Sequence, residues 1–397
     1  MSQIIRPESP RQSRRRTPID PSRLADQGLV LTRSPDRAVN DRGAQEANGT
    51  PTVDSPATAA RPILGDDHPT MRAIVQSAYG KADVLQLGTI ERPTPRAGEV
   101  LIQVRAAGLD RGTWHLMTGT PYLLRLMGFG VRRPKNRVPG FDVAGTVVAV
   151  GAGVSRFAVG DAVFGVSRGS FAEYAAARED KLAHKPETLT FEQAAVLGIS
   201  GLTALQALQD TGRVTAGQQV LVVGASGGVG TYVVQIAVAL GARVIGVCST
   251  AKTELVAALG AERVLDYTKH DFADGSEHYD VVIDIGGKSS ISRLRRALTP
   301  KGTLVLVGGE DGGRWNPGMG RQLLALMLSP FVAQRLKMLV CKEHHTGLER
   351  LAELAAAGSI TPVIERAYLL EQVPDAMRHL AAGRARGKLV IRVADAS

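Results

Sequence analysis

The segment Gln219–Gly230 reads Gln-Val-Leu-Val-Val-Gly-Ala-Ser-Gly-Gly-Val-Gly and decides the fold of the chain. Its apolar first half, up to Gly224, predicts a buried β-strand, and the helix that follows carries apolar residues on one face: Val229, Val233, Ile236 and Leu240. Glycines at such a turn let backbone amides approach a phosphate, and the helix N-terminus adds N–H groups and a favourable dipole. The segment therefore predicts a dinucleotide-binding turn, with contacts from Ser226, Gly227, Gly228, Val229 and Gly230. A glycine-rich turn without a ligand is the alternative.

Outward from this turn, strands and helices alternate. Strands are expected at 243–248, 263–267, 279–285 and 303–308, with helices through Leu255 and Leu259 and over 291–298. This order predicts an α/β fold, a Rossmann-type doubly wound parallel sheet with right-handed crossovers, over residues 191–359.

The end of the second strand bears on the choice of nicotinamide cofactor. An acid often stands there to bind the adenosine ribose of NAD. Here the strand runs into Ser249 and Thr250, with Lys252 close behind and no carboxylate at the strand end. Hydroxyls and a cation suit a 2′-phosphate, which favours NADPH over NADH. A solvated Lys252 on the first turn of a helix is the alternative.

The part of the chain before this sheet has a different pattern. Between residues 71 and 190, short β-rich runs at 100–104, 143–150 and 162–166 are separated by glycine turns, which predicts a small barrel or sandwich. Two late strands, at 363–368 and 388–393, could return to it, so that residues 360–397 close this first domain.

Residues 1–70 differ in composition from the rest of the chain. They hold nine of the 20 prolines and ten arginines against nine acids, with no lysine and no aromatic residue. No hydrophobic period runs through them, so a disordered N-terminal extension is expected. The acids among them argue against an organelle transit peptide.

The bulk composition limits the classes of function. The net charge of +10 could indicate a nucleic acid or lipid partner, but the basic residues are scattered and a groove for an anionic cofactor accounts for them. The most apolar stretch, residues 323–340, is interrupted by polar residues, so no membrane helix is expected. The two cysteines, Cys248 and Cys341, exclude a disulfide framework and a four-cysteine zinc site, and they suit a cytoplasmic protein.

From Met71 to its end the chain resembles the medium-chain dehydrogenase/reductase superfamily. The resemblance rests on Gly98-Glu99-Val100, on 139–147 (Pro-Gly-Phe-Asp-Val-Ala-Gly-Thr-Val), on 159–165 (Val-Gly-Asp-Ala-Val-Phe-Gly), on Gly201-Leu202-Thr203-Ala204 and on the glycine turn. It implies a GroES-like substrate domain, a Rossmann domain, a cleft between them and a homodimer.

The zinc enzymes of this superfamily carry a cysteine where this chain has Asp110 and a histidine where it has Phe141. Zinc favours cysteine and histidine ligands, so no catalytic metal is expected. The chain then resembles the zinc-free branch of quinone oxidoreductases and enone reductases. That resemblance implies Thr203 near the nicotinamide, Tyr267 beside the adenosine phosphate, Lys388 as a cofactor contact, and Asp110 in place of a usual asparagine, as a proton donor or a polar lining residue.

The substrate pocket is harder to predict. A loop with Trp114, His115, Met117, Tyr122, Leu123 and Met127 could form one wall, and the segment 323–331 the other, although both could be core or dimer surface. An apolar lining suits a quinone or enone. The expected function is NADPH-dependent hydride transfer to such a substrate. The alternatives are a zinc-independent alcohol or aldehyde reductase and a non-catalytic NADPH-binding sensor.

Overall fold

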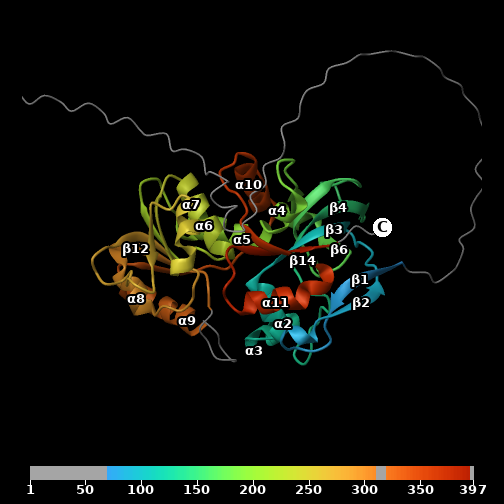
Figure 1. Ribbon diagram of the computed structural model, residues 1–397, viewed down its shortest axis with the longest axis horizontal. Helices are drawn as coiled ribbons and strands as arrows, with labels where there is room; N and C mark the ends of the chain where they lie inside the picture. Colours follow the sequence, from blue (N-terminus) through green and yellow to red (C-terminus); the bar gives the residue numbers. More distant parts are fainter. Residues whose placement is uncertain (1–68, 310–318, 394–397) are drawn as a thin grey trace, which may run out of the picture.

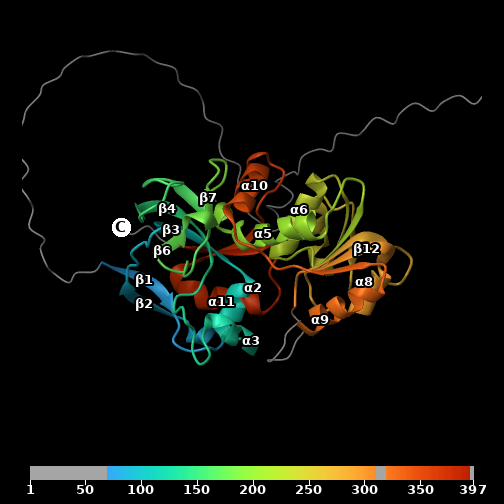
Figure 2. The ribbon, with the colours of Figure 1, turned by 180° about the vertical axis from the view of Figure 1, so that it is seen from behind.

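The computed structural model describes residues 69–309 and 319–393, and the extension predicted over residues 1–70 lies almost wholly outside this range. The described chain forms two lobes, each built on its own sheet, with helix α5 (Gly198–Gln206) between them (Figure 1). Seen from behind, the lobes lie on either side of the same central helix (Figure 2). No helix of the described residues is long and apolar enough to cross a bilayer.

The second lobe is a six-stranded parallel sheet in the order β10-β9-β8-β11-β12-β13. This order confirms the doubly wound fold, because the strands reverse direction of addition at β8, next to the glycine turn. The strands are β8 (Gln219–Val223), β9 (Arg243–Cys248), β10 (Arg263–Asp266), β11 (Tyr279–Asp284), β12 (Leu298–Leu306) and β13 (Arg335–Met338).

Alternate residues of these strands pack against helices on opposite faces. Val220 and Val222 join a core with α6 and α7, whereas Leu221 and Val223 join a core with α8 and α9. The strands are covered on both sides, which explains their unbroken apolar runs. The helices are α6 (Gly228–Ala239), α7 (Thr253–Ala258), α8 (Ile291–Arg296), α9 (Met319–Leu328) and α10 (His345–Ala356).

The first lobe is a largely antiparallel seven-stranded sheet with the path β14-β15-β3-β4-β5-β7, while β6 pairs with β3. A separate hairpin of β1 and β2 packs beside it. Its strands are β1 (Thr70–Val75), β2 (Gln86–Glu91), β3 (Glu99–Leu109), β4 (Asp142–Val150), β5 (Ala162–Val166), β6 (Tyr174–Arg178), β7 (Leu182–His184), β14 (Ile364–Leu369) and β15 (Lys388–Arg392). Its helices are α2 (Arg111–Thr118), α3 (Tyr122–Leu124), α4 (Phe191–Ala195) and α11 (Val373–Ala381).

The C-terminal return expected from the sequence is present. Strand β15 pairs antiparallel with β3, so that Leu389 lies opposite Leu109, and β14 pairs with β15. The end of the chain therefore belongs to the first lobe, after the parallel sheet is complete. The domain boundaries near residues 190 and 360 stay a prediction.

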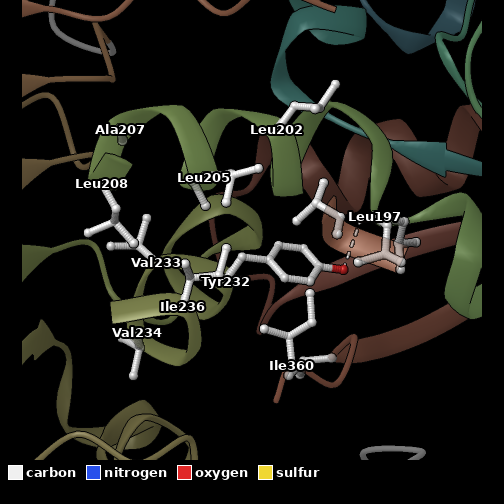
Figure 3. Close-up of a cluster of buried hydrophobic side chains, with 14 of the residues drawn as sticks. Leu197, Leu202, Leu205, Ala207, Leu208, Tyr232, Val233, Val234, Ile236 and Ile360 are labelled. Carbon is white, nitrogen blue, oxygen red and sulfur yellow. Dashed lines mark hydrogen bonds between the residues drawn. The ribbon is translucent and has the colours of Figure 1, made fainter. Parts of the chain in front are cut away.

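A cluster of buried side chains packs α5 against α6 (Figure 3). Tyr232 of α6 is fully buried, and its hydroxyl donates to the carbonyl of Val196, 3.0 Å away, just before α5. Leucines of α5, Leu202 and Leu205, pack around this ring with Ile360. Since a buried tyrosine needs a partner for its hydroxyl, the bond fixes how α5 is placed relative to the glycine turn.

Candidate functional site

The glycine turn has the backbone geometry that its sequence predicts. Gly224 has a φ of 89°, in the left-handed region that favours glycine, and it turns the chain out of β8. A Cβ on Gly230 would lie 2.1 Å from the carbonyl oxygen of Gly224, so only glycine allows the helix to pack this close to the strand. Gly227 is the N-cap of α6 and offers no side-chain cap. The first turn of α6 therefore presents amides that a phosphate can accept from.

The turn is also joined to the first lobe. The N–H of Gly387 donates to the carbonyl of Ser226 at 2.9 Å, and Gly227 forms an isolated parallel bridge with Gly387. The side chain of Lys388 passes so close to the turn that a Cβ on Gly228 would lie 2.9 Å from its Cδ. The start of β15 and the cofactor turn thus form one unit, which spans the two lobes.

A buried polar network lies beside this junction. The ammonium of Lys388 is 3.3 Å from Oδ2 of Asp142 and donates to the hydroxyl of Ser200 at 2.9 Å. The N–H of Ile199 donates to Oδ1 of Asp142 at 2.7 Å. The two charged side chains are almost completely buried. The partners come from three separate parts of the chain, so the network links β4, α5 and β15.

Burial determines the acidity of Asp142. Burial, with a smaller contribution from Asp110, raises the pKa of this carboxyl from 3.8 to about 6, although Lys388 and the N–H of Ile199 oppose the shift. A carboxyl whose pKa lies this close to neutral exchanges a proton easily. The sequence analysis identified Asp142 only as a motif residue, because its partner Lys388 is 246 positions away.

Asp110 begins helix α2 as its N-cap. Oδ1 accepts from the N–H of Thr113 at 2.8 Å, and Oδ2 accepts from the Thr113 hydroxyl at 3.2 Å. Asp110 lines a cavity of about 270 Å³, which we call the turn cavity. The other walls of the turn cavity include Ser200, Gly227, Gly228, Ile285, Ala385 and Lys388. Asp110, the glycine turn and Lys388, which the sequence analysis predicted separately, therefore face one space.

Thr203 lies on α5, one turn after Ser200. Its hydroxyl donates to the carbonyl of Ile199 at 2.6 Å, and the side chain is nearly buried. The Cys341 thiol bonds to Thr203, and burial raises the pKa of this thiol. Thr203 is thus held by its own helix, and no local pattern predicts that Cys341 lies beside it.

The predicted adenosine residues gather at the ends of β9 and β10. Tyr267 is exposed, and the ammonium of Lys252 donates to the carbonyl of Ala385 at 2.8 Å. Burial lowers the pKa of Lys252. Ser249, the N-cap of the short helix that ends at Lys252, is partly exposed beside them. These residues frame the edge of the sheet at which an adenosine ribose binds in Rossmann folds.

A carboxylate from the neighbouring strand β10 also lies near this edge. Asp266, the last residue of β10, pairs in register with Cys248 and accepts a short hydrogen bond from the Thr250 hydroxyl. That bond, with further bonds from Thr268, lowers the pKa of Asp266 to about 2, so the side chain is ionised. The absence of a carboxylate was expected at the end of the second strand, whereas Asp266 ends the third. Its oxygens are occupied by Thr250, Thr268 and Lys269.

A second cavity of about 410 Å³, which we call the α2 cavity, lies on the other side of α2. Thr113, whose N–H and hydroxyl donate to Asp110, lines the α2 cavity, so a bonded pair at the start of α2 has one member in the wall of each cavity. Met117, Met127, Phe129 and Phe141 give it apolar walls, and Tyr79 and Gln76 add polar groups. This arrangement of a mostly apolar space with a few polar groups is typical of a small-molecule site.

Only part of the predicted pocket wall lines this cavity. Met117 and Met127 do so, but Trp114 packs against the core of the first lobe and Tyr122 packs against Arg125. The His115 ring bonds to the carbonyl of Thr120. Residues 323–331 line none of the cavities described here, and Leu323, Leu324, Met327 and Phe331 are exposed on α9 and the turn after it.

The metal-ligand positions of the zinc enzymes hold other groups here. Phe141 is partly buried and lines the α2 cavity, and Asp110 caps α2. Within residues 69–309 and 319–393, no three His, Cys, Asp or Glu side chains form a group that could hold a metal ion. The donor set at this point is suited to hydrogen bonding.

Two family models match the chain. The alcohol dehydrogenase GroES-like domain matches residues 96–187, and the zinc-binding dehydrogenase model matches residues 259–391. The first covers most strands of the first lobe. The second runs from the end of α7 to β15 and so crosses from the second lobe back into the first.

Characterised relatives are similar over most of their length. The 2-methylene-furan-3-one reductase of Solanum lycopersicum is 32% identical over 357 residues, which cover 86% of this chain and 84% of that protein. The quinone oxidoreductase of Sus scrofa is 32% identical over 336 residues, which cover 81% and 97%. The solved structure of the quinone oxidoreductase from Coxiella burnetii superposes with a TM-score of 0.73 at 29% identity, over 82% of this chain and 100% of that one.

Proposed function

Because the chain belongs to the quinone oxidoreductase-like part of the medium-chain dehydrogenase/reductase superfamily, we propose that it transfers hydride from NADPH to a quinone or an α,β-unsaturated carbonyl compound. The observation that carries the proposal is the bond between Asp110, in the wall of the turn cavity, and Thr113, in the wall of the α2 cavity. The turn cavity has a phosphate-binding helix N-terminus at one end and Asp110 at the other. The apolar α2 cavity begins one helical turn away, at Thr113.

The residues around the turn cavity fit a dinucleotide. The amides at Gly228 and Val229 would bind the pyrophosphate, with Lys388 as a neighbouring cation. The nicotinamide end would lie between Asp110, Ser200 and Ile285, close to Thr203. The bound cofactor supplies the hydride, and the protein supplies alignment and exclusion of water.

The edge of the sheet favours NADPH as the cofactor. Lys252 and the hydroxyl of Ser249 offer a cation and a donor for a 2′-phosphate, whereas the Thr250 hydroxyl already donates to Asp266. The carboxylate described at this edge is that of Asp266, and its oxygens are engaged by Thr250, Thr268 and Lys269. An NADH enzyme would need a free carboxylate for the ribose hydroxyls at this place.

The test is a titration of the purified full chain with NADPH and NADH, followed by oxidation of each in the presence of quinones, enones and aldehydes. We expect NADPH to bind about tenfold more tightly than NADH and its oxidation to depend on a quinone or an enone. Lys252→Gln should remove most of this preference, because it weakens NADPH alone. Equal binding of both cofactors would refute the preference. Oxidation with aldehydes alone would favour an aldehyde reductase, and binding without oxidation a sensor.

Asp110 is the proposed proton donor to the reduced substrate. Oδ1 is held by the N–H of Thr113, but the partner of Oδ2 is a hydroxyl, which can donate or accept. A proton on Oδ2 is therefore compatible with the cap. Asp110→Asn keeps a good N-cap residue and removes the acid. We expect turnover to fall about 100-fold while the NADPH dissociation constant stays within twofold. Unchanged turnover would leave Asp110 as a cap and a polar wall.

A homodimer is also proposed. The exposed apolar face of α9 lies beside β13, the edge strand of the parallel sheet, and such a surface is commonly covered by another subunit. Light scattering of the full chain would give the mass of a monomer if this proposal is wrong.

A further inference from the structure

The stretch between Asp110 and Asp142 has an unusual charge. It holds six cationic residues, Arg111, Arg125, Arg132, Arg133, Lys135 and Arg137, and no acid. Four of the six fall within six consecutive positions, 132–137. The four cations at 132–137 lie between α3 and β4. The most basic segment of the first lobe is therefore also the segment beside the α2 cavity.

The loop 129–137 is held in place by backbone bonds, so its charges have defined positions. The hydroxyl of Tyr79 donates to the carbonyl of Gly130 at 2.6 Å, and the N–H of Lys135 donates to the carbonyl of Phe129 at 2.8 Å. The N–H of Gln76, in the first lobe, donates to the carbonyl of Arg137 at 2.8 Å. Because Gln76, Tyr79 and Phe129 also line the α2 cavity, the bonds that shape the loop are part of its wall.

Most of these cations have no anionic partner among the residues that the structure describes. Arg125 stacks on Tyr79 and Tyr122 and donates to the carbonyl of Gly119. Among the described residues, no acid pairs with the exposed side chains of Arg132, Arg133, Lys135, Arg137 and Arg168. Elsewhere in the described chain exposed arginines such as Arg178 and Arg243 do have acidic partners. The cluster is therefore a local excess of positive charge.

Lys135 and Arg168 lie in the wall of the α2 cavity itself, together with Asn136. Arg168 comes from the loop after β5, so the two cations reach the cavity from separate segments. The result is an apolar space that begins at Thr113, the bonded neighbour of Asp110, and that has cations in its wall. Resting on the proposed function, we propose that the physiological substrate carries an anionic group, a carboxylate or a phosphate, which Lys135 and Arg168 bind.

Electrostatics and packing support this substrate class together. Lys135 and Arg168, which have no acidic partner among the described residues, line one cavity, and the repulsion between two cations is relieved when an anion binds both. A basic rim also attracts an anionic substrate before it enters, which raises the rate of association at low ionic strength. The apolar walls then hold the uncharged chain of the substrate, and the reactive double bond is left at the start of α2.

The experiment compares an ω-carboxyalkyl enone with its methyl ester, which has the same carbon skeleton without the charge, on the full chain with NADPH. We expect kcat/KM to be at least about tenfold higher for the acid, and this ratio to fall as salt rises from about 20 to 300 mM. The variant Lys135→Gln/Arg168→Gln should reduce the acid-to-ester ratio about tenfold. Lys301→Gln removes an exposed cation from the second lobe and should leave the ratio as it is. Crotonyl-coenzyme A, in a parallel series, separates a phosphate-bearing carrier from a short carboxylate.

The outcomes are distinguishable from a failure of the proposed function. Reduction of acid and ester with equal kcat/KM would overturn the anionic substrate while keeping the reductase. If neither is reduced, binding of the corresponding saturated acid and ester, followed by Trp114 fluorescence in the presence of NADPH, decides between the two. Tighter binding of the acid, lost in the double variant, would support the anion site, and equal binding would refute it. Loss of salt-sensitive RNA retention in the double variant, with an unchanged acid-to-ester ratio, would assign the cations to nucleic acid instead.

Discussion

The two cavities of the cleft are built from different materials. The turn cavity is shaped by backbone: a Cβ on Gly230 would meet a carbonyl oxygen at 2.1 Å, and the start of β15 is bonded to the turn. The α2 cavity is shaped by side chains on a loop with more room. Gly128 there also has a positive φ, of 100°, yet a Cβ on it would meet nothing within 4 Å.

This difference separates what can vary from what is fixed. A backbone site binds a group of constant shape, such as a pyrophosphate, and almost any larger side chain damages it. A side-chain site can change its ligand by substitution without disturbing the fold. The buried network of Asp142, Lys388 and Ser200 lies beside the turn cavity, which Lys388 and Ser200 line, and it should be the most sensitive point of the site.

The largest expected effect is therefore at this network. Lys388→Met removes the cation and leaves Asp142 buried without it, which should lower the free energy of unfolding by about 3 kcal/mol. Asp142→Asn should cost less, since an amide oxygen can still accept from Ile199 and escapes the cost of burying a carboxylate. Urea unfolding of the chain without cofactor measures both. An Asp142→Asn penalty larger than that of Lys388→Met would contradict this order.

The pH dependence provides the control for that experiment. The pKa of Asp142 is about 6 in the folded chain and 3.8 ordinarily, so folding favours its protonated form. Its contribution to stability is full below pH 3.8 and is lost as the pH rises through about 6. Asp142→Asn should remove this decline, so the variant should gain stability relative to the parent as the pH rises from about 4 to 7. Parallel curves between pH 4 and 7 would mean that Asp142 is ionised throughout.

A smaller effect, of a different kind, is expected at the turn. Gly230→Ala places a methyl group against the Gly224 carbonyl, which should raise the NADPH dissociation constant about 100-fold and lower stability by about 2 kcal/mol. Fluorescence titration and urea unfolding measure the two. Gly320→Ala, in the open on α9, is the matched control and should stabilise slightly. If Gly230→Ala binds NADPH as tightly as Gly320→Ala does, NADPH binding does not require the close backbone approach at Gly230.

The local pattern of the sequence predicted the parallel sheet closely. Strand β9 has the expected bounds, and β8 and α6 meet at the expected turn, because an apolar run between glycines has few alternative structures. Strand β13 was missed. It has four residues, of which only Leu336 is buried, so charged residues at Arg335 and Lys337 hide the strand period at this sheet edge.

The candidate site was predictable where it depends on local backbone and not where it depends on distant contacts. The glycine turn and Lys252 were predicted from the local pattern and Asp110 from the family resemblance. Asp110 and Lys388 line the same cavity in the structure. The bond from Lys388 to Asp142 and the approach of Asp266 to Thr250 depend on strand register between separate segments. The α2 cavity combines residues from four stretches between Gln76 and Arg168. Of the wall residues predicted from the sequence, only Met117 and Met127 line it.

The pairing of β15 with β3 has a consequence for how this protein is made. Strand β3 leaves the ribosome early, but its neighbour Leu389 is among the last described residues to be synthesised. Residues 106–109 of β3 therefore lack their β15 partners while the whole parallel sheet is translated, although β4 and β6 can already pair with this strand. We expect nascent chains stalled before residue 388 to protect the second lobe from protease and to leave the first lobe exposed to chaperones. In this molecule the order of synthesis and the order of completion are opposite.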